Sequence, residues 1–188
     1  MSTVPRYTVA DLELLPETLD DTRYELIDGE LHVSRQPDWR HQFTANRIAR
    51  FLDTWDDQTG LGVTLPAPSV VFAVEDAAAP DVVWVSRERW SGVVGDDGKL
   101  HRAPDLAVEV LSPGGRNEER DRTFKLRQYS RYGVREYWIV DWRDRTVQIH
   151  RREEAQLRLT ATLTAEDTLT SPLLPGFTVA VRELFPAR

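Results

Sequence analysis

One carboxylate interrupts an otherwise apolar run, the Leu-Ala-Val-Glu-Val-Leu of residues 106–111. A strand that is apolar on both faces is typical of the centre of a covered sheet. A carboxylate buried there must be protonated, paired or bound to a cation, because burying the bare charge costs too much free energy. Glu109 is therefore a candidate metal ligand. The alternative is a structural ion pair with an arginine, or a hydrogen bond to the backbone.

Asp81 is the second candidate ligand. It follows Pro80 and opens the preceding apolar stretch, residues 82–85. Opposed residues on neighbouring strands lie roughly 5 Å apart, and two carboxylates at that distance repel unless a divalent cation lies between them. Oxygen ligands of this kind suit Mg²⁺ or Mn²⁺. Asp105 shares a strand with Glu109, but roughly 13 Å separates them, too far for a shared ion. Taken alone, Asp81 is weak evidence, because Pro-Asp before a strand is usually a turn.

Lys125 is the candidate cation, and it is one of only two lysines in the chain. It lies on a helix expected after the Glu109 strand. A helical wheel places Lys125 on the sheet-facing side, in line with Asp121 and Tyr129, and places three arginines on the opposite side (Arg120, Arg127 and Arg131). A lysine there can act as a point charge beside a scissile phosphate. The alternative is a lysine at the edge of the apolar face that pairs with Asp121 and reaches solvent.

Two further candidates lie near the N-terminus. Residues 24–33 predict a β-hairpin around a type I′ turn at Asp28-Gly29. Its register places Glu25 opposite His32 on the polar face, with the apolar face formed by Tyr24, Leu26, Leu31 and Val33. Asp38 is a predicted N-cap for a helix over residues 39–55, and His41 lies on its buried stripe. A lone histidine there is more often a satisfied core residue than a functional one.

The remaining elements give the fold class. We expect strands near residues 61–74, 81–85, 106–111 and 137–140, with a hairpin return at 147–150 and further strand-like stretches to residue 185. A second helix is expected from Asn117 as cap to Gly133 as stop. The core order is helix-strand-strand-strand-helix-strand, which predicts an α+β (or α/β) fold with a mixed sheet flanked by helices, an N-terminal hairpin and a C-terminal β extension.

Composition limits the function classes. The 188 residues suit one domain, residues 1–188, and contain no cysteine, which excludes disulfide scaffolds, thiol catalysis and Cys-ligated metals. No signal peptide or membrane span is recognisable, so we expect a cytoplasmic protein without a membrane partner. The net charge is −7, yet residues 112–152 form a basic block. Such asymmetry is typical of a site that holds a metal on one side and phosphate on the other, or simply of a solvated helix face.

Together these segments resemble the Uma-two family of endonucleases, a branch of the restriction-endonuclease-like PD-(D/E)xK superfamily and formerly a domain of unknown function. The resemblance rests on Tyr-Glu-Leu-Ile-Asp-Gly-Glu-Leu, Pro-Asp-Val and Val-Glu-Val-Leu-Ser-Pro, at residues 24–31, 80–82 and 108–113. Further matches are residues 41–42, 121–129, 133–141, 174–177 and 184–185. No single motif is specific, but their order and spacing over nearly the whole chain are.

The resemblance implies a role for each candidate. Asp81 matches the aspartate of the PD motif and Glu109 the acidic residue of the second motif. The motif's lysine would fall at position 111, where this chain has leucine, so Lys125 is the candidate for a lysine that has moved to the next helix. Glu25 and His41 match positions that recur in the family.

The implied activity is hydrolysis of DNA phosphodiester bonds by an endonuclease that holds Mg²⁺, or Mn²⁺, through Asp81 and Glu109. Near the strand-to-helix turn, Arg116 and Arg120 are expected to contact the DNA. We expect Lys125→Ala to remove cleavage and to leave stability near that of the wild type. One alternative is a catalytically inactive protein on the same fold that binds DNA or a partner. Another is a dimeric adaptor with an apolar patch formed by Trp84, Trp90 and Trp142, and a homodimer is compatible with the nuclease as well.

Overall fold

A six-stranded mixed sheet forms the centre of the computed structural model, which describes residues 6–15, 22–34, 37–112, 114 and 118–187. The strand order is β10-β9-β8-β7-β6-β3, and β7 and β8 are its parallel pair. The strands are β3 (Gly62–Pro66), β6 (Val82–Ser86), β7 (Leu106–Val110), β8 (Glu136–Asp141), β9 (Thr146–Glu153) and β10 (Gln156–Leu163).

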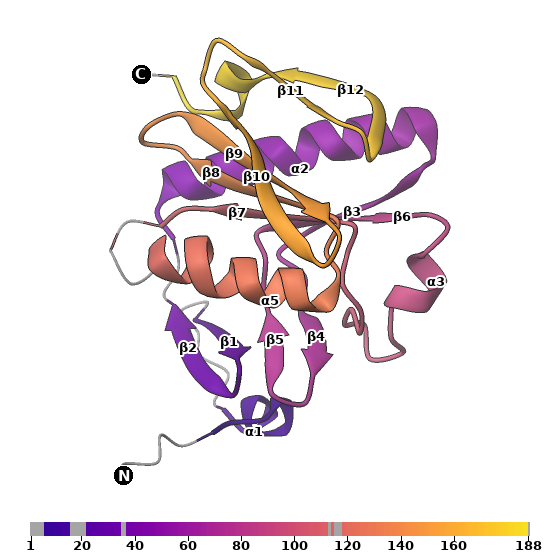
Figure 1. Cartoon of the computed structure of the whole chain (residues 1–188), viewed down its shortest axis with the longest axis vertical. Coiled ribbons are helices and arrows are strands. Elements are labelled where there is room, and N and C mark those ends of the chain that lie inside the picture. Colours follow the sequence, from indigo (N-terminus) through magenta and orange to yellow (C-terminus); the bar gives the residue numbers. More distant parts are fainter. Residues whose placement is uncertain (1–5, 16–21, 35–36, 113, 115–117, 188) are drawn as a thin grey trace.

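Helices cover both faces of this sheet (Figure 1). On one face lies α2 (Trp39–Thr59), whose Leu52 belongs to the same core cluster as Val108 and Trp138. On the other face lie the π-helical turn η1 (Arg120–Phe124) and α5 (Lys125–Tyr132), where Tyr129 shares a second cluster with Ala107. Side chains alternate along a strand, so the α5 side of β7 also receives Glu109.

A four-stranded sheet, in the order β2-β1-β5-β4, lies on the far side of α5 (Figure 1). It consists of β1 (Arg23–Ile27), β2 (Glu30–Ser34), β4 (Val70–Ala73) and β5 (Asp76–Ala78). The Gln128 amide of α5 ties the sheet to the core, since it donates to the Leu26 carbonyl at 2.7 Å and to Asp76 at 2.8 Å. The strand β1 therefore lies next to α5 and presents its residues to that helix.

Short elements complete the structure. The helices α1 (Val9–Glu13) and α3 (Trp90–Val93) lie at the periphery. The hairpin of β11 (Thr168–Ser171) and β12 (Leu174–Ala180), followed by the 3₁₀ turn η2 (Val181–Leu184), packs on the outer side of α2. There the Trp55 indole donates to the Pro175 carbonyl at 3.1 Å. Within the described ranges no helix is long and apolar enough to span a membrane.

The predicted α+β class and core order are confirmed, and local details agree. The hairpin has the predicted register, with Glu25 opposite His32. Its turn residues Asp28 and Gly29 have φ of 51° and 74°, as a type I′ turn requires. Asp38 caps α2 by accepting the Arg40 and His41 amides.

One expected strand was wrong, and one predicted helix cap lies outside the described residues. The strand expected at 61–74 is two strands in different sheets, because the chain turns at Ala67, whose φ is 47° and whose amide donates to the Asp81 carbonyl at 2.9 Å. Both faces of the hairpin carry a buried residue, Glu25 on the polar face and Leu26 on the apolar face, while Val33 is exposed. The predicted cap Asn117 lies outside the described residues, whereas the predicted stop at Gly133 is confirmed by its φ of 93°.

Candidate active site

Glu109 lies at the centre of the molecule, on β7 between β6 and β8, and only 3% of it is exposed. Its Oε1 accepts hydrogen bonds from the Lys125 ammonium at 2.8 Å and from the Tyr129 hydroxyl at 2.6 Å. Burial, together with the neighbouring carboxylates of Asp121 and Asp81, raises the pKa of Glu109 to about 8 in spite of the Lys125 charge. Its environment therefore resists a full negative charge and favours one more cation or a proton.

Asp81 lies one residue before β6, and the pairing of Val82 with Val108 continues toward Glu109. The Asp81 carboxylate accepts from Arg23 at Oδ1 (2.7 Å) and from the Val110 amide at Oδ2 (2.8 Å), and Oδ2 lies 3.1 Å from His41 Nε2. Burial alone would raise the pKa of Asp81, but His41, Arg23 and the Val110 amide outweigh it and lower the pKa to about 2. The two candidate ligands thus differ in charge: the low pKa of Asp81 keeps it ionised at neutral pH, whereas the raised pKa of Glu109 favours its protonated form.

Lys125 is confirmed on the sheet-facing side, and 2% of its side chain is exposed. Its ammonium lies 2.8 Å from Glu109 Oε1, 2.9 Å from Glu25 Oε1 and 3.6 Å from Asp121 Oδ1. Burial lowers the pKa of Lys125, but the carboxylates of Glu109, Glu25 and Asp121 outweigh it, and the net shift is upward. Lys125 is therefore a fixed, internal cation, and its pairing with Asp121 does not carry it out to solvent.

Glu25 reaches this cluster from β1, with one carboxylate oxygen shared between Lys125 and the Ala79 amide, which donates at 2.9 Å. Burial raises the pKa of Glu25, but Lys125, Arg120 and the Ala79 hydrogen bond outweigh it, so the pKa lies below its usual value. His41 reaches Asp81 from the first turn of α2, and its Nδ1 is buried without a hydrogen-bond partner among the described residues. The structure thus brings together all five residues predicted as catalytic: Asp81, Glu109, Lys125, Glu25 and His41.

The arginines behave differently from the prediction. Arg120 does not lie opposite Lys125: it is buried, with Nε 3.2 Å from Asp121 Oδ1 and Nη1 3.7 Å from Glu25 Oε2. The cause is the π-helical turn, in which the Lys125 amide bonds to the Arg120 carbonyl, five residues back. Arg116, the other predicted DNA contact, lies outside the described residues.

Sequence reasoning missed Arg23 and the involvement of Asp121. Arg23 stands two residues before Glu25 on the same strand, so the two share a face. The alternation of side chains along this strand could therefore have identified Arg23 from the sequence. Asp121 was noted only as a partner for Lys125.

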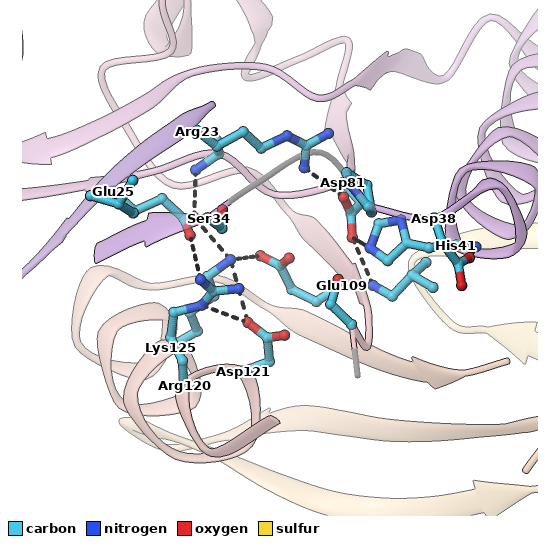
Figure 2. Close-up of a pocket in the computed structure, with 15 residues that line it drawn as sticks. Arg23, Glu25, Ser34, Asp38, His41, Asp81, Glu109, Arg120, Asp121 and Lys125 are labelled. Carbon is cyan, nitrogen blue, oxygen red and sulfur yellow. Dashed lines mark hydrogen bonds and ion pairs between the residues drawn. The ribbon is translucent and has the colours of Figure 1, made fainter. Parts of the chain in front are cut away.

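These side chains surround one cavity of about 340 Å³, shown in Figure 2. One wall carries Arg23, Asp81 and His41, and the other carries Glu25, Arg120, Asp121 and Lys125, with Glu109 between them. The four buried carboxylates of this cavity face three side chains that are permanently cationic, because Arg and Lys keep their protons. Burial is the main cause of the upward pKa shift of Glu109, and the neighbouring carboxylates add to it.

A divalent cation is compatible with this donor set. In the described part of the chain, no group of three or more His, Asp or Glu side chains is arranged to hold a metal ion. Mg²⁺, however, is usually bound by one or two carboxylates, with substrate phosphate and water completing its shell. Asp81 and Glu109 line one cavity and supply that number, and because burial disfavours the charged form of Glu109, a cation bound beside it would stabilise that form.

Comparison with known structures defines the class of fold. A "putative nuclease belonging to DUF820" from Anabaena variabilis, solved as a crystal structure, is similar with a TM-score of 0.73 and 17% sequence identity. The match covers 95% of this chain and 97% of that chain. The fold is therefore that of a nuclease-like α+β protein.

The family follows from the sequence. The model of the Uma2 family, described as "Putative restriction endonuclease", matches residues 9–182. This chain belongs to the Uma2 family, as the resemblance predicted. A comparison with curated proteins gives no match.

Proposed function

We propose that this protein is a metal-dependent endonuclease that hydrolyses DNA phosphodiester bonds, with Asp81 and Glu109 as ligands of Mg²⁺ or Mn²⁺. The observation that carries the proposal is the convergence of these two carboxylates and Lys125 on one cavity. Family membership agrees with it, since Uma2 is described as a restriction endonuclease family. A divalent ion bound there supplies Lewis acidity and lowers the pKa of a bound water.

Each protein group then has a role. Lys125, adjacent to Glu109, stabilises the negative charge that develops on the phosphate or orients the attacking water. Glu25 holds the Lys125 ammonium at 2.9 Å, and His41 holds Asp81 at 3.1 Å, so both position their neighbours. Arg120 lines the same cavity and adds positive charge for the DNA backbone. Arg116, in the same basic block, is proposed as a second DNA contact.

We propose that the protein acts in the cytoplasm, and a homodimer would suit cleavage of both strands of a duplex. The adaptor alternative loses its main support: Trp84 is buried and its indole donates to Asp56 at 2.8 Å, so it is not part of a surface patch.

The decisive test is a plasmid-cleavage assay with Mg²⁺ and with Mn²⁺, on duplex and on single-stranded DNA. We expect Asp81→Asn and Glu109→Gln to abolish cleavage. Asp97→Asn is the matched control, because Asp97 also pairs with a histidine, His101 at 2.9 Å, but in an exposed pair outside the cavity. Cleavage by both cavity variants at the wild-type rate would refute the proposal.

An inactive protein that binds DNA or a partner on the same fold is the second candidate. It is favoured by leucine at position 111 and by the engagement of Asp81 and Lys125 in internal ion pairs. Such a protein has no need of a divalent ion. DNA or partner binding without measurable Mn²⁺ binding would support this candidate against the enzyme.

A further inference from the structure

Arg23 is the most accessible partner of Asp81. Its Nη1 donates to Asp81 Oδ1 at 2.7 Å, and 31% of the Arg23 side chain is exposed while the aspartate is buried. The other two partners cannot withdraw as easily. The Val110 amide belongs to the backbone of β7, and His41 is buried in the first turn of α2.

Two cavities border Arg23 and leave its guanidinium room to move away from Asp81. Arg23, His41 and Asp81 line the main cavity and also a second cavity of about 260 Å³, which Gln42 and Ala67 line as well. A guanidinium that leaves Asp81 therefore faces open space on either side. Its planar fork of N–H groups matches the oxygens of a phosphate in a bidentate fashion.

We propose that Arg23 is an exchangeable counter-ion. It neutralises Asp81 while no divalent cation is bound, and when one binds it leaves Asp81 and binds a phosphate of the nucleic acid. This inference rests on the proposed function, because it requires the metal site. A buried carboxylate that stays ionised, as the low pKa of Asp81 indicates, is stabilised by a positive partner, and Arg23 supplies one until the ion takes over.

The two roles open to Arg23 predict opposite effects on metal affinity. A counter-ion competes with the metal for Asp81 Oδ1, so its removal tightens metal binding. An arginine that merely orients the carboxylate prepares the ligand, so its removal weakens metal binding. Metal affinity therefore separates exchange from orientation without reference to cleavage.

The experiment is a calorimetric titration of the full chain with Mn²⁺, in the wild type and in Arg23→Gln. We expect Arg23→Gln to bind Mn²⁺ about tenfold more tightly, equivalent to about 1.4 kcal/mol. Arg89→Gln is the matched control, since Arg89 pairs with the buried Asp105 at 2.8 Å, is 34% exposed and lies outside the cavity. Its Mn²⁺ affinity should equal that of the wild type.

A second measurement follows the released guanidinium. Binding of a short labelled DNA duplex is measured against salt in Ca²⁺ buffer, and Arg23→Gln should lower the slope of log K against log salt by about one phosphate contact. If Arg23→Gln does not fold, Arg23→Met serves instead, and it should bind Mn²⁺ more tightly than the wild type because it also removes the positive charge that pairs with Asp81.

The failures are distinguishable. Unchanged or weaker Mn²⁺ binding by the folded Arg23 variant, with clear binding by the wild type, overturns the exchange and leaves the proposed nuclease intact. Absence of Mn²⁺ binding in the wild type and in every variant overturns both. Tight binding that appears only in the Arg23 variant supports the exchange.

Discussion

Replacement of Lys125 by methionine tests the internal charge network most directly. The substitution keeps the length of the side chain but removes the ammonium that Glu109, Glu25 and Asp121 share at 2.8, 2.9 and 3.6 Å. Breaking a buried pair by removal of one partner costs about 3–5 kcal/mol, because a buried charge is left uncompensated. Because Lys125 is buried in this network, we expect its loss to destabilise the protein, in contrast to the sequence-based expectation that stability stays near that of the wild type.

Two features place the cost at the lower end of that range. Arg120 remains beside Asp121 and Glu25, and Glu109, whose pKa of about 8 favours the protonated form at neutral pH, leaves little uncompensated charge. We therefore expect a loss of about 3 kcal/mol in the free energy of unfolding. For a chain of this length that corresponds to a fall in Tm of about 6–12 °C.

The assay is urea unfolding followed by tryptophan fluorescence. Lys99→Met is the control, since the other lysine makes an exposed pair with Glu13 at 3.0 Å, and such pairs contribute about 0–1 kcal/mol. A double-mutant cycle with Glu109→Gln should give a coupling energy of about 1–3 kcal/mol. The reasoning fails if Lys125→Met is as stable as Lys99→Met, or if the coupling energy is within about 0.5 kcal/mol of zero.

The other predictions concern metal, acid and salt. Saturating Mn²⁺ should raise the Tm by about 5–10 °C through preferential binding to the native state, and Glu109→Gln should abolish the rise in a thermal-shift assay; an equal rise in the variant would place the ion elsewhere. Burial alone would raise the pKa of Asp105, but the Ser86 amide and two arginines hold it below its usual value. The stability that ionised Asp105 contributes through these interactions is therefore present above its unfolded pKa, near 3.9, and is lost as pH falls through its lower folded pKa. Acid unfolding should show this loss in the wild type and not in Asp105→Asn, and parallel curves would contradict it. DNA binding should be weak and steeply salt-dependent; Arg120→Gln should weaken it more than Arg127→Gln, and equal effects in a filter-binding titration would indicate a diffuse surface.

The sequence predicted those site residues whose positions depend on regular elements. Strand pairing brings Asp81 toward Glu109, and helical spacing turns Lys125 toward the sheet. These placements require only the two periodicities of strand and helix. The catalytic roles of these residues stay predictions, because geometry alone does not test them.

Alternation could not tell that both faces of the N-terminal hairpin carry buried residues. The register of Glu25 was correct, yet Glu25 is buried like Leu26 on the apolar face, because its partner is the internal ammonium of Lys125. A polar pattern looks the same whether it meets water or a charged cavity. The split of the strand at residues 61–74 had a local signal, since Pro66 and Pro68 flank Ala67, and proline disfavours continued strand pairing.

The position of Arg120 depends on an irregularity that no helical wheel contains. In a regular α-helix, residues five apart point in directions roughly 140° apart, because each residue turns the chain by about 100°. In the π-helical turn the Lys125 amide bonds to the Arg120 carbonyl, and the wider turn brings both side chains to the same side. Such π-helical turns are rare, and those that occur are frequently found at functional sites. Here the turn lets one helix present two cations to Glu25, with Lys125 at 2.9 Å and Arg120 at 3.7 Å. The π-helical turn thus places Arg120, which the helical wheel put on the outer side of the helix, in the wall of the cavity.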